Sequence, residues 1–452
     1  MKHSLLRLSI LTLLLAIKVV VFAAHEINGI NYIIYEDKGF AEVTSKKPKY
    51  SGDIVIPSEI EYKGKKCTVK TIGASAFYFC DNLTSVTIPN TVTGIRGNAF
   101  GYCSKLTTIE IPNSVVTIGE RCFEVSGLTT IYIPNSVQGI EQYAFSGCKK
   151  LKSVYIGNSL HWFQENVFAG CDSIETIEYH STLQIPWFQG KEKLKTLVVG
   201  DEVEYIDNCS FDGCISLTNV TIGNSVSSIK TAAFRNCENM KNIKLPNSLK
   251  EIGYFAFEGC KSLENIVIPN SVIKTYGGVF ENCENLLSVK LSNSIEIISE
   301  TMFFGCKKLK EVIIPIGIKT IERSAFDQCE SIETMTLPNT LININDNAFY
   351  GCYNLKTVIS YNPTPPSIYD STFDNYENKK LFVPKGSEDL YKNAKGWWRF
   401  YQIEGIDVSS INSTFIDAES ESSIYNLNGT KVDGSSIGKG VYIRNGKKII
   451  IK

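Results

Sequence analysis

Apolar and polar residues follow one another along most of this chain in a pattern that repeats about every 23 residues. A phenylalanine marks the repeat from Phe77 to Phe349, at intervals of 23 residues with one of 22 and one of 20. A fixed period of about 20–50 residues is typical of a solenoid, in which one small unit is stacked many times. The members of this column are Phe77, Phe100, Phe123, Phe145, Phe168, Phe188, Phe211, Phe234, Phe257, Phe280, Phe303, Phe326 and Phe349.

A single repeat shows what each position contributes. In residues 83–103, Val86 and Ile88 alternate with polar residues, which predicts a short strand with one buried face. Phe100 is predicted to fill the centre of the coil, and Cys103 to close it as a small hydrophobic residue. Each coil alone would leave its apolar faces bare, so we expect about thirteen coils stacked about 4.8 Å apart.

Most of the cysteines share one position of the repeat, three residues after the phenylalanine. Neighbouring side chains in such a column lie about one strand spacing apart, which is somewhat longer than the Cβ separation of a disulfide. No CxxC pair occurs, and zinc ligands must converge on one point rather than form a ladder. We therefore predict buried thiols, without disulfides or zinc, at Cys80, Cys103, Cys148, Cys171, Cys214, Cys237, Cys260, Cys283, Cys306, Cys329 and Cys352.

The first residues indicate a secretory signal peptide at 1–23. Lys2 and Arg7 precede an apolar run over residues 8–22, and Ala23 suits a cleavage site. A membrane anchor is the alternative, but the run is short and contains Lys18. We expect a secreted or outer-surface protein with no transmembrane segment after signal removal.

The repeat contains a recurring sequence motif. It consists of the turn IPNSV, found at 111–115, 133–137 and 268–272, followed by an isoleucine, an AF pair and a GC pair. In this motif the chain resembles the BspA-like leucine-rich repeat family of bacterial surface proteins, over about residues 73–358. The resemblance implies a mainly β, leucine-rich-repeat-like, right-handed solenoid of about 13 coils across residues 71–360.

The same resemblance extends to the two ends of the repeats. Residues 24–70 look like the N-terminal β cap of the family, with a hairpin over 31–44, and residues 361–405 look like its C-terminal cap. Caps are needed because an end coil would otherwise expose an unpaired strand edge. The paired Trp397 and Trp398 belong to the second cap, although they could equally form a binding platform.

The last residues predict a linker and a small β module. Residues 406–423 are rich in Ser, Asp and Glu, and Asn-Gly pairs at 428–429 and 445–446 are hairpin signals in residues 424–452. The ending GVYIRNGKKIIIK resembles the C-terminal sorting domain that Bacteroidetes use for export through the type 9 secretion system. An ordinary terminal hairpin is the alternative.

Charge and motifs argue against several functions. A formal charge of −1 lacks the basic excess of an electrostatic nucleic-acid binder. After signal removal only His25, His161 and His180 remain, and no HExxH, phosphate-binding loop or nucleophile elbow occurs. We expect no enzyme, no catalytic residue, no cofactor and no metal.

An irregular region offers the first candidate for a binding site. The coil after Phe168 is three residues short, keeps Phe188 as its core residue and has Lys191 at the cysteine position. Local repacking is one interpretation. A recognition site is the other, because tryptophan and tyrosine anchor many interfaces; the residues around this coil are His161, Trp162, His180 and Trp187.

The outward column of the strands offers the second candidate, because repeat proteins bind partners over such extended surfaces. Tyr132 and Tyr155 are expected to be neighbours, flanked by Glu110 and Glu178. The full column is Thr87, Glu110, Tyr132, Tyr155, Glu178, Val198, Thr221, Lys244, Val267, Lys290, Ile313, Thr336 and Ile359.

The family resemblance implies adhesion or protein recognition, with host matrix proteins, host plasma proteins or other microbes as partners. A glycan-binding protein for nutrient capture is an alternative, because the rings of Tyr132, Tyr155, Trp162 or Trp187 would suit sugars. A structural surface protein without a ligand is a further alternative.

Overall fold

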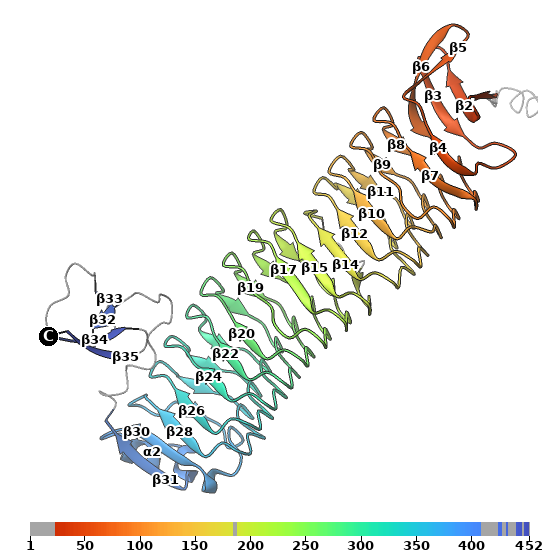
Figure 1. The fold of residues 1–452 in the computed structure, drawn as a ribbon. Coiled ribbons are helices and arrows are strands. Elements are labelled where there is room, and N and C mark those ends of the chain that lie inside the picture. Colours follow the sequence, from red (N-terminus) through yellow and green to blue (C-terminus); the bar gives the residue numbers. More distant parts are fainter. Residues whose placement is uncertain are drawn as a thin grey trace, which may run out of the picture. The chain divides into compact units, whose positions relative to one another are not determined.

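The computed structural model describes residues 23–183 and 188–407, and beyond them only the backbone of short strands between 424 and 451. The chain is a mainly-β solenoid of about 14 turns with almost no helix, which confirms the predicted fold class (Figure 1). Nearly all of the predicted signal peptide and linker lie outside the described residues. The chain forms two compact units, residues 1–151 with 159–171, and residues 152–158 with 172–452.

The first unit begins with antiparallel strands and continues with parallel strands contributed by successive coils. The strands β2 and β3 form the predicted hairpin, and β3 then pairs in parallel with β6. The main sheet has the order β1-β2-β3-β6-β8-β9-β11-β13, with β5 beside β6, and β4 pairs with β7. The strands are β1 (Ala24–Ile27), β2 (Ile30–Tyr35), β3 (Phe40–Thr44), β4 (Gly52–Val55), β5 (Glu59–Tyr62), β6 (Lys65–Ile72), β7 (Leu83–Thr87), β8 (Gly94–Ile95), β9 (Thr117–Ile118), β10 (Thr130–Ile133), β11 (Gly139–Ile140) and β13 (Trp162–Phe163).

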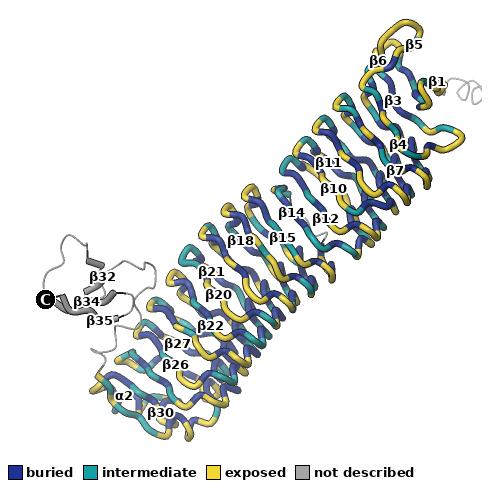
Figure 2. Tube along the Cα trace, viewed as in Figure 1, coloured by how far each residue is buried: buried dark blue, intermediate teal, exposed yellow. Residues whose placement is uncertain are grey.

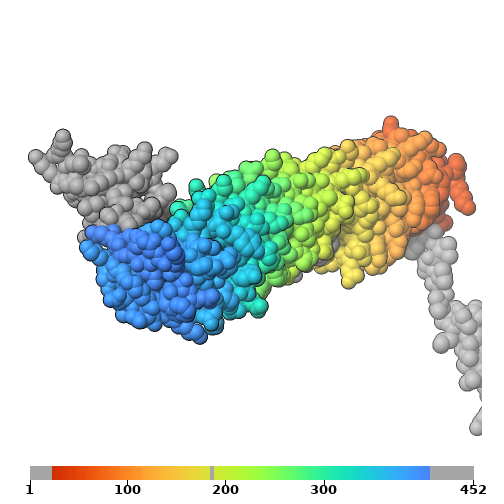
Figure 3. Space-filling model, turned by 90° about the horizontal axis from the view of Figure 1, so that it is seen from below, coloured from red at the N-terminus to blue at the C-terminus, as the bar shows by residue number. Residues whose placement is uncertain are grey.

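The second unit consists of parallel sheets in which successive coils each add a strand, and its coils follow one another in chain order from yellow through green to blue (Figure 3). The sheets are β12 (Ser153–Ile156), β14 (Thr176–Tyr179), β15 (Thr196–Val199) and β17 (Asn219–Ile222); β16 (Tyr205–Ile206), β18 (Ser228–Ile229), β19 (Glu251–Ile252) and β21 (Lys274–Thr275); β20 (Asn265–Val267), β22 (Ser288–Lys290) and β24 (Glu311–Ile313); β23 (Ile297–Ile298), β25 (Thr320–Ile321), β27 (Asn343–Ile344) and β29 (Ser367–Ile368); and β26 (Thr334–Leu337), β28 (Thr357–Ser360), β30 (Lys380–Pro384) and β31 (Gln402–Ile406).

The last described residues form a separate antiparallel sheet in which β34 lies between β32 and β35. This order agrees with the predicted hairpin between β34 and β35. Its strands are β32 (Ile424–Asn426), β33 (Lys431–Val432), β34 (Gly440–Arg444) and β35 (Lys447–Ile451).

The phenylalanine column is the core of both units. In the first unit the rings from Phe77 to Phe168 stack with centroids 5.0–5.3 Å apart. In the second unit the rings from Phe211 to Phe349 stack at 5.2–5.8 Å. Phe373 adds a ring 5.0 Å beyond Phe349, although the sequence had suggested a cap residue there. Buried and exposed residues therefore alternate within every coil (Figure 2).

The eleven cysteines of the column are buried and form no disulfides, as predicted, and the other three cysteines form none either. From Cys103 onward the structure adds a partner that the sequence did not suggest. The thiol of Cys260 donates a hydrogen bond to the carbonyl oxygen of Phe234 in the preceding coil, at 3.3 Å. Thiol and carbonyl are likewise 3.1–3.3 Å apart from Cys214 to Cys352. The column thus joins neighbouring coils by hydrogen bonds as well as by apolar contact.

The glycines before the column cysteines are turn residues. Gly213 and Gly259 have φ of +74° and +69°, a region that only glycine enters without cost. Where the repeat has another residue there, as at Val125 with φ of +53°, the backbone keeps the same left-handed conformation. The coil geometry therefore overrides local preference at this position.

The C-terminal part of the second unit contains the helix α2 (Glu388–Asn393) and the short 3₁₀ helices η2 (Tyr376–Asn378) and η3 (Trp397–Arg399). Trp397 is fully buried, and its indole N–H donates to the carbonyl oxygen of Pro366 at 2.8 Å. Trp398 is 63% exposed. The two tryptophans therefore face different surroundings and do not form a common platform.

Not every coil has the predicted outward strand. Residues 106–112 and 241–246 follow the same apolar pattern as their neighbours but form no strand. In the second unit this interrupts the outer face between β17 and β20, which belong to different sheets.

Candidate recognition site

The outward column of the second unit has the predicted register. Tyr155 lies opposite Glu178 across β12 and β14, and Glu178 lies opposite Val198 across β14 and β15. Farther along, Val267, Lys290 and Ile313 lie opposite one another in β20, β22 and β24. Val267 and Ile313 are 57% and 58% exposed, so apolar side chains do face solvent on these strands.

A histidine held by two carboxylates lies at one end of this column. His180 directly follows β14, with its Nε2 3.0 Å from Oε1 of Glu178 and its Nδ1 2.9 Å from Oε2 of Glu202. The ring of Tyr155 lies 5.3 Å from the imidazole, centroid to centroid. Three predicted site residues, Tyr155, Glu178 and His180, therefore come together. Glu202 completes the cluster and was not predicted.

The glycine beneath the histidine makes room for this arrangement. A Cβ on Gly200 would overlap Nδ1 of His180 and crowd Oε2 of Glu202. The missing side chain lets the imidazole lie directly against the next coil, within reach of both carboxylates. Gly200 is therefore part of the site although it carries no functional group.

The two carboxylates favour the charged imidazole. Partial burial alone would lower the pKa of His180, but the hydrogen bonds to Glu178 and Glu202 outweigh it and the pKa is raised. The hydrogen bond from His180 lowers the pKa of Glu202. Because ionised carboxylates only accept hydrogen bonds, both ring nitrogens can donate at once only in the imidazolium form. The cluster therefore places one cation between two anions beside an aromatic ring.

The remaining predicted residues that the structure describes lie in the first unit. Glu110 is exposed in the stretch without a strand, and Tyr132 in β10 is 52% exposed. His161 and Trp162 are exposed at the start of β13, where Trp162 lies opposite Gly139 of β11. A Cβ on Gly139 would overlap the indole, so this glycine makes room for Trp162.

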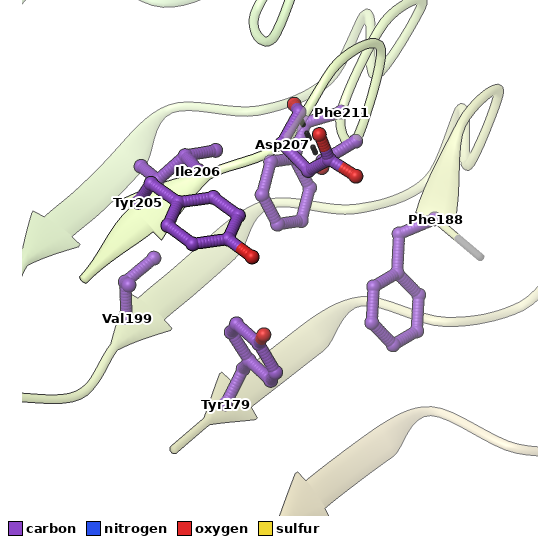
Figure 4. A pocket seen from close by; sticks show the side chains of 8 residues that line it. Tyr179, Phe188, Val199, Tyr205, Ile206, Asp207 and Phe211 are labelled. Carbon is purple, nitrogen blue, oxygen red and sulfur yellow. Dashed lines mark hydrogen bonds between the residues drawn. The ribbon is translucent and has the colours of Figure 1, made fainter. Parts of the chain in front are cut away.

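Trp187 lies outside the described residues, so its predicted place beside the short coil stays a prediction. The short coil itself keeps Phe188 buried and has a buried Lys191 at the cysteine position, as expected. A small cavity lies beside Phe188, lined by Tyr179, Tyr205, Phe211 and others (Figure 4). The hydroxyl of Tyr179 donates to the carbonyl oxygen of Leu183.

In the described part of the chain, no group of three or more His, Cys, Asp or Glu side chains is placed to hold a metal ion. No helix among the described residues is long and apolar enough to cross a membrane. The partly exposed side chains of Tyr155, Glu178 and His180 suit hydrogen-bonding and ring contacts with a partner.

Comparison with known proteins shows the family. A profile described as BspA type Leucine rich repeat region matches in six copies over residues 70–186, 182–310 and 274–396, more than half of the chain. No curated protein matches the chain.

Two solved structures are similar to this chain, and the first of them supports the fold. A leucine-rich repeat protein from Bacteroides ovatus ATCC 8483 is 29% identical, with a TM-score of 0.57, over 85% of this chain and 100% of the other. A leucine rich cell surface protein from Faecalibacterium prausnitzii A2-165 is 24% identical over 75% of this chain and 94% of the other, with a TM-score of only 0.30. On the strength of the repeat profile, the chain belongs to the BspA-type leucine-rich repeat family.

Proposed function

We propose that this chain is a recognition protein of the bacterial surface, which binds a protein partner through the outward face of its strands. One observation carries the proposal. Stacking uses the inward positions of the repeat, whereas the outward column leaves Tyr155, Glu178, Val267 and Ile313 accessible in register. A surface that mixes aromatic, apolar and charged groups on a fixed support is suited to protein binding.

The location at the surface is part of the same proposal. The signal peptide over 1–23 would direct export, and the module over 424–452 would act as a type 9 sorting tail. Deleting residues 424–452 is expected to abolish surface display while the protein still accumulates in the cell. Undiminished display after this deletion would rule out the sorting role.

Binding assays with the exported chain test the recognition itself. The immobilised protein is presented with host matrix proteins, plasma proteins and microbial surface extracts, and saturable binding of one protein is expected. The double change Tyr155→Ala and Glu178→Gln should weaken that binding at least tenfold. Tyr353→Ala removes a tyrosine outside the outward column that is 65% exposed, and should leave binding unchanged. No saturable protein partner, or equal binding by the double variant, would contradict the proposal.

Glycan binding is a second candidate because Tyr132 and Trp162 expose 52% and 41% of their surface, and exposed rings stack on sugars. A glycan array separates the two functions. A glycan signal lost in Trp162→Ala, without any saturable protein partner, would favour sugar recognition.

A further inference from the structure

A groove opens on the outer face of the second unit, where the row of strands is interrupted. Residues 241–246 form no strand, and β20 and β22 follow them in the next coils. The groove encloses about 420 Å³. Its walls include Lys244, Asn247, Asn265, Val267, Pro269 and Lys290.

The two lysines of the groove lack carboxylate partners. Among the described residues, no Asp or Glu oxygen lies within 4 Å of the ammonium group of Lys244 or Lys290. Other lysines of the same coils are paired, as Lys261 is with Glu238 at 2.7 Å and Lys307 with Glu284 at 3.3 Å. The groove therefore holds two uncompensated positive charges.

The floor and rim of the groove are aliphatic and amidic. Ile243, Leu245 and Ile268 are buried beneath it, whereas Val267 is 57% exposed. Asn265 accepts a hydrogen bond from Ser288 at 2.6 Å through its side-chain oxygen, which leaves its NH₂ group as a donor. None of the lining residues is aromatic, so the stacking surface typical of sugar sites is absent from this groove.

Along the solenoid, a lysine, a valine and a second lysine occupy the same repeat position in three successive coils. Val267 lies opposite Lys290, and Lys244 occupies the same repeat position one coil earlier. Two coils correspond to about 9.6 Å at a strand spacing of about 4.8 Å. Residues seven apart on an α-helix are separated by about 10.5 Å along its axis, and a residue three or four positions on lies between them on the same face.

We propose that this groove binds an acidic amphipathic helix of the protein partner. Two of its carboxylates, seven residues apart, pair with Lys244 and Lys290, and an apolar side chain between them packs on Val267. This inference rests on the proposed recognition function and specifies one site and one type of ligand for it.

The test selects ligands without assuming their sequence. Random 16-residue peptides displayed on phage are selected on the full chain, and the enriched peptides are synthesised. Their affinities are measured for the wild type, for Lys244→Gln with Lys290→Gln, and for the matched control Lys261→Gln with Lys307→Gln. The groove variant and the control variant each lose two lysine charges. The two lysines are 46 residues apart in both variants, so their spacing in the chain is matched as well. Thermal melts establish that all three proteins are folded.

The proposal expects enriched peptides with two acidic residues seven apart and an apolar residue between them. They should bind the wild type and the control at least tenfold more tightly than the groove variant, and more weakly as salt is raised. No enrichment, neutral or basic peptides, or equal binding to the groove variant would overturn it. Heparin binding that is lost in the groove variant, without acidic peptides, would assign the groove to anionic sugars and also overturn it.

The outcomes separate this inference from the proposed function. A protein partner that depends on Tyr155 and Glu178 but not on the groove lysines would leave recognition standing and remove the groove from it. Acidic peptides that depend on the groove, without any saturable protein partner in the extracts, would support the groove and contradict the wider proposal.

Discussion

The short coil around Phe188, which follows Phe168 after 20 residues instead of 23, differs from the regular coils from Phe211 to Phe349 in how closely its core rings stack. The rings of Phe188 and Phe211 are 6.2 Å apart, whereas the next rings are 5.2–5.8 Å apart. A cavity lies beside the short coil, and Lys191 replaces the column cysteine. Yet the thiol of Cys214 still donates to the carbonyl oxygen of Phe188, at 3.2 Å.

The comparison shows which contacts the repeat maintains when its length changes. The ring column and the thiol bond from the following coil persist, and a small cavity lies beside them. Side-chain packing at this coil is therefore looser than in the regular coils, while the central contacts are conserved in geometry.

Removing a core ring should have the largest effect and should differ between the two regions. Phe257→Ala in a regular coil is expected to cost about 3–5 kcal/mol, because close-packed neighbours leave a cavity. Phe188→Ala should cost about 1 kcal/mol less, since part of its surroundings is already empty. Denaturant unfolding of both variants measures the difference. Equal losses, or a loss below about 1 kcal/mol for Phe257→Ala, would contradict this view of the core.

Removing a column thiol should have an intermediate effect. Cys260→Ala deletes a fully buried side chain and leaves the carbonyl oxygen of Phe234 without its donor, so a loss of about 1–2 kcal/mol is expected. Cys209 is only half-buried and lies outside the column, so Cys209→Ala should change stability by less than about 0.5 kcal/mol. Unfolding in urea measures both, and a reversed order would refute the role given to the thiols.

Adding one methylene group should have opposite signs in the two regions. Val199 lines the cavity, so Val199→Ile is expected to raise the free energy of unfolding by about 0.8 kcal/mol. Val279 lies in a close-packed regular coil, where the same enlargement should cost about 1 kcal/mol through overpacking. Losses of equal size in both variants would show that the cavity is not available to side chains.

The smallest of these effects is expected from the titration of His180 and Glu202 as pH changes. Its pKa is raised on folding, so the stability it contributes is complete below the unfolded value of about 6.5 and is lost as pH rises through the folded value. The lowered pKa of Glu202 acts in the opposite sense: its contribution is present above about 4.3 and is lost as pH falls through the folded value.

Melting temperatures between about pH 5.5 and 8.5 measure the histidine contribution. The wild type should lose stability relative to His180→Gln as pH rises through this range. A difference between the two proteins that does not change with pH would mean that the imidazole does not titrate between the carboxylates.

Much of the core could be predicted because the repeat period records it directly. Phe257 and Cys260 recur at the same spacing as their neighbours, and only an inward position demands the same residue type in every coil. Phe373 was missed because prolines interrupt the pattern before it and its interval from Phe349 is 24 residues. The acceptor of the thiols was missed because a backbone carbonyl leaves no trace in the sequence.

The candidate site was only partly predictable. Tyr155 and Glu178 follow from the register, but Glu202 lies outside the strand column, one coil beyond His180. Its distance of 22 residues from His180, close to one repeat, is the signal that could have identified it. The break in the outer strands at 241–246 has no such signal, because the residues there keep the ordinary apolar pattern of the repeat.

The bond from each thiol to the carbonyl of the coil before it has a mechanical consequence. In the stretch from Phe211 to Cys352, these bonds and the ring contacts connect each coil only to its immediate neighbours. A pulling force applied along the chain would therefore peel coils away singly. Each detached coil would release 23 residues, or roughly 75–80 Å of extended chain. Under load the protein would therefore lengthen in even steps rather than unfold in one cooperative event.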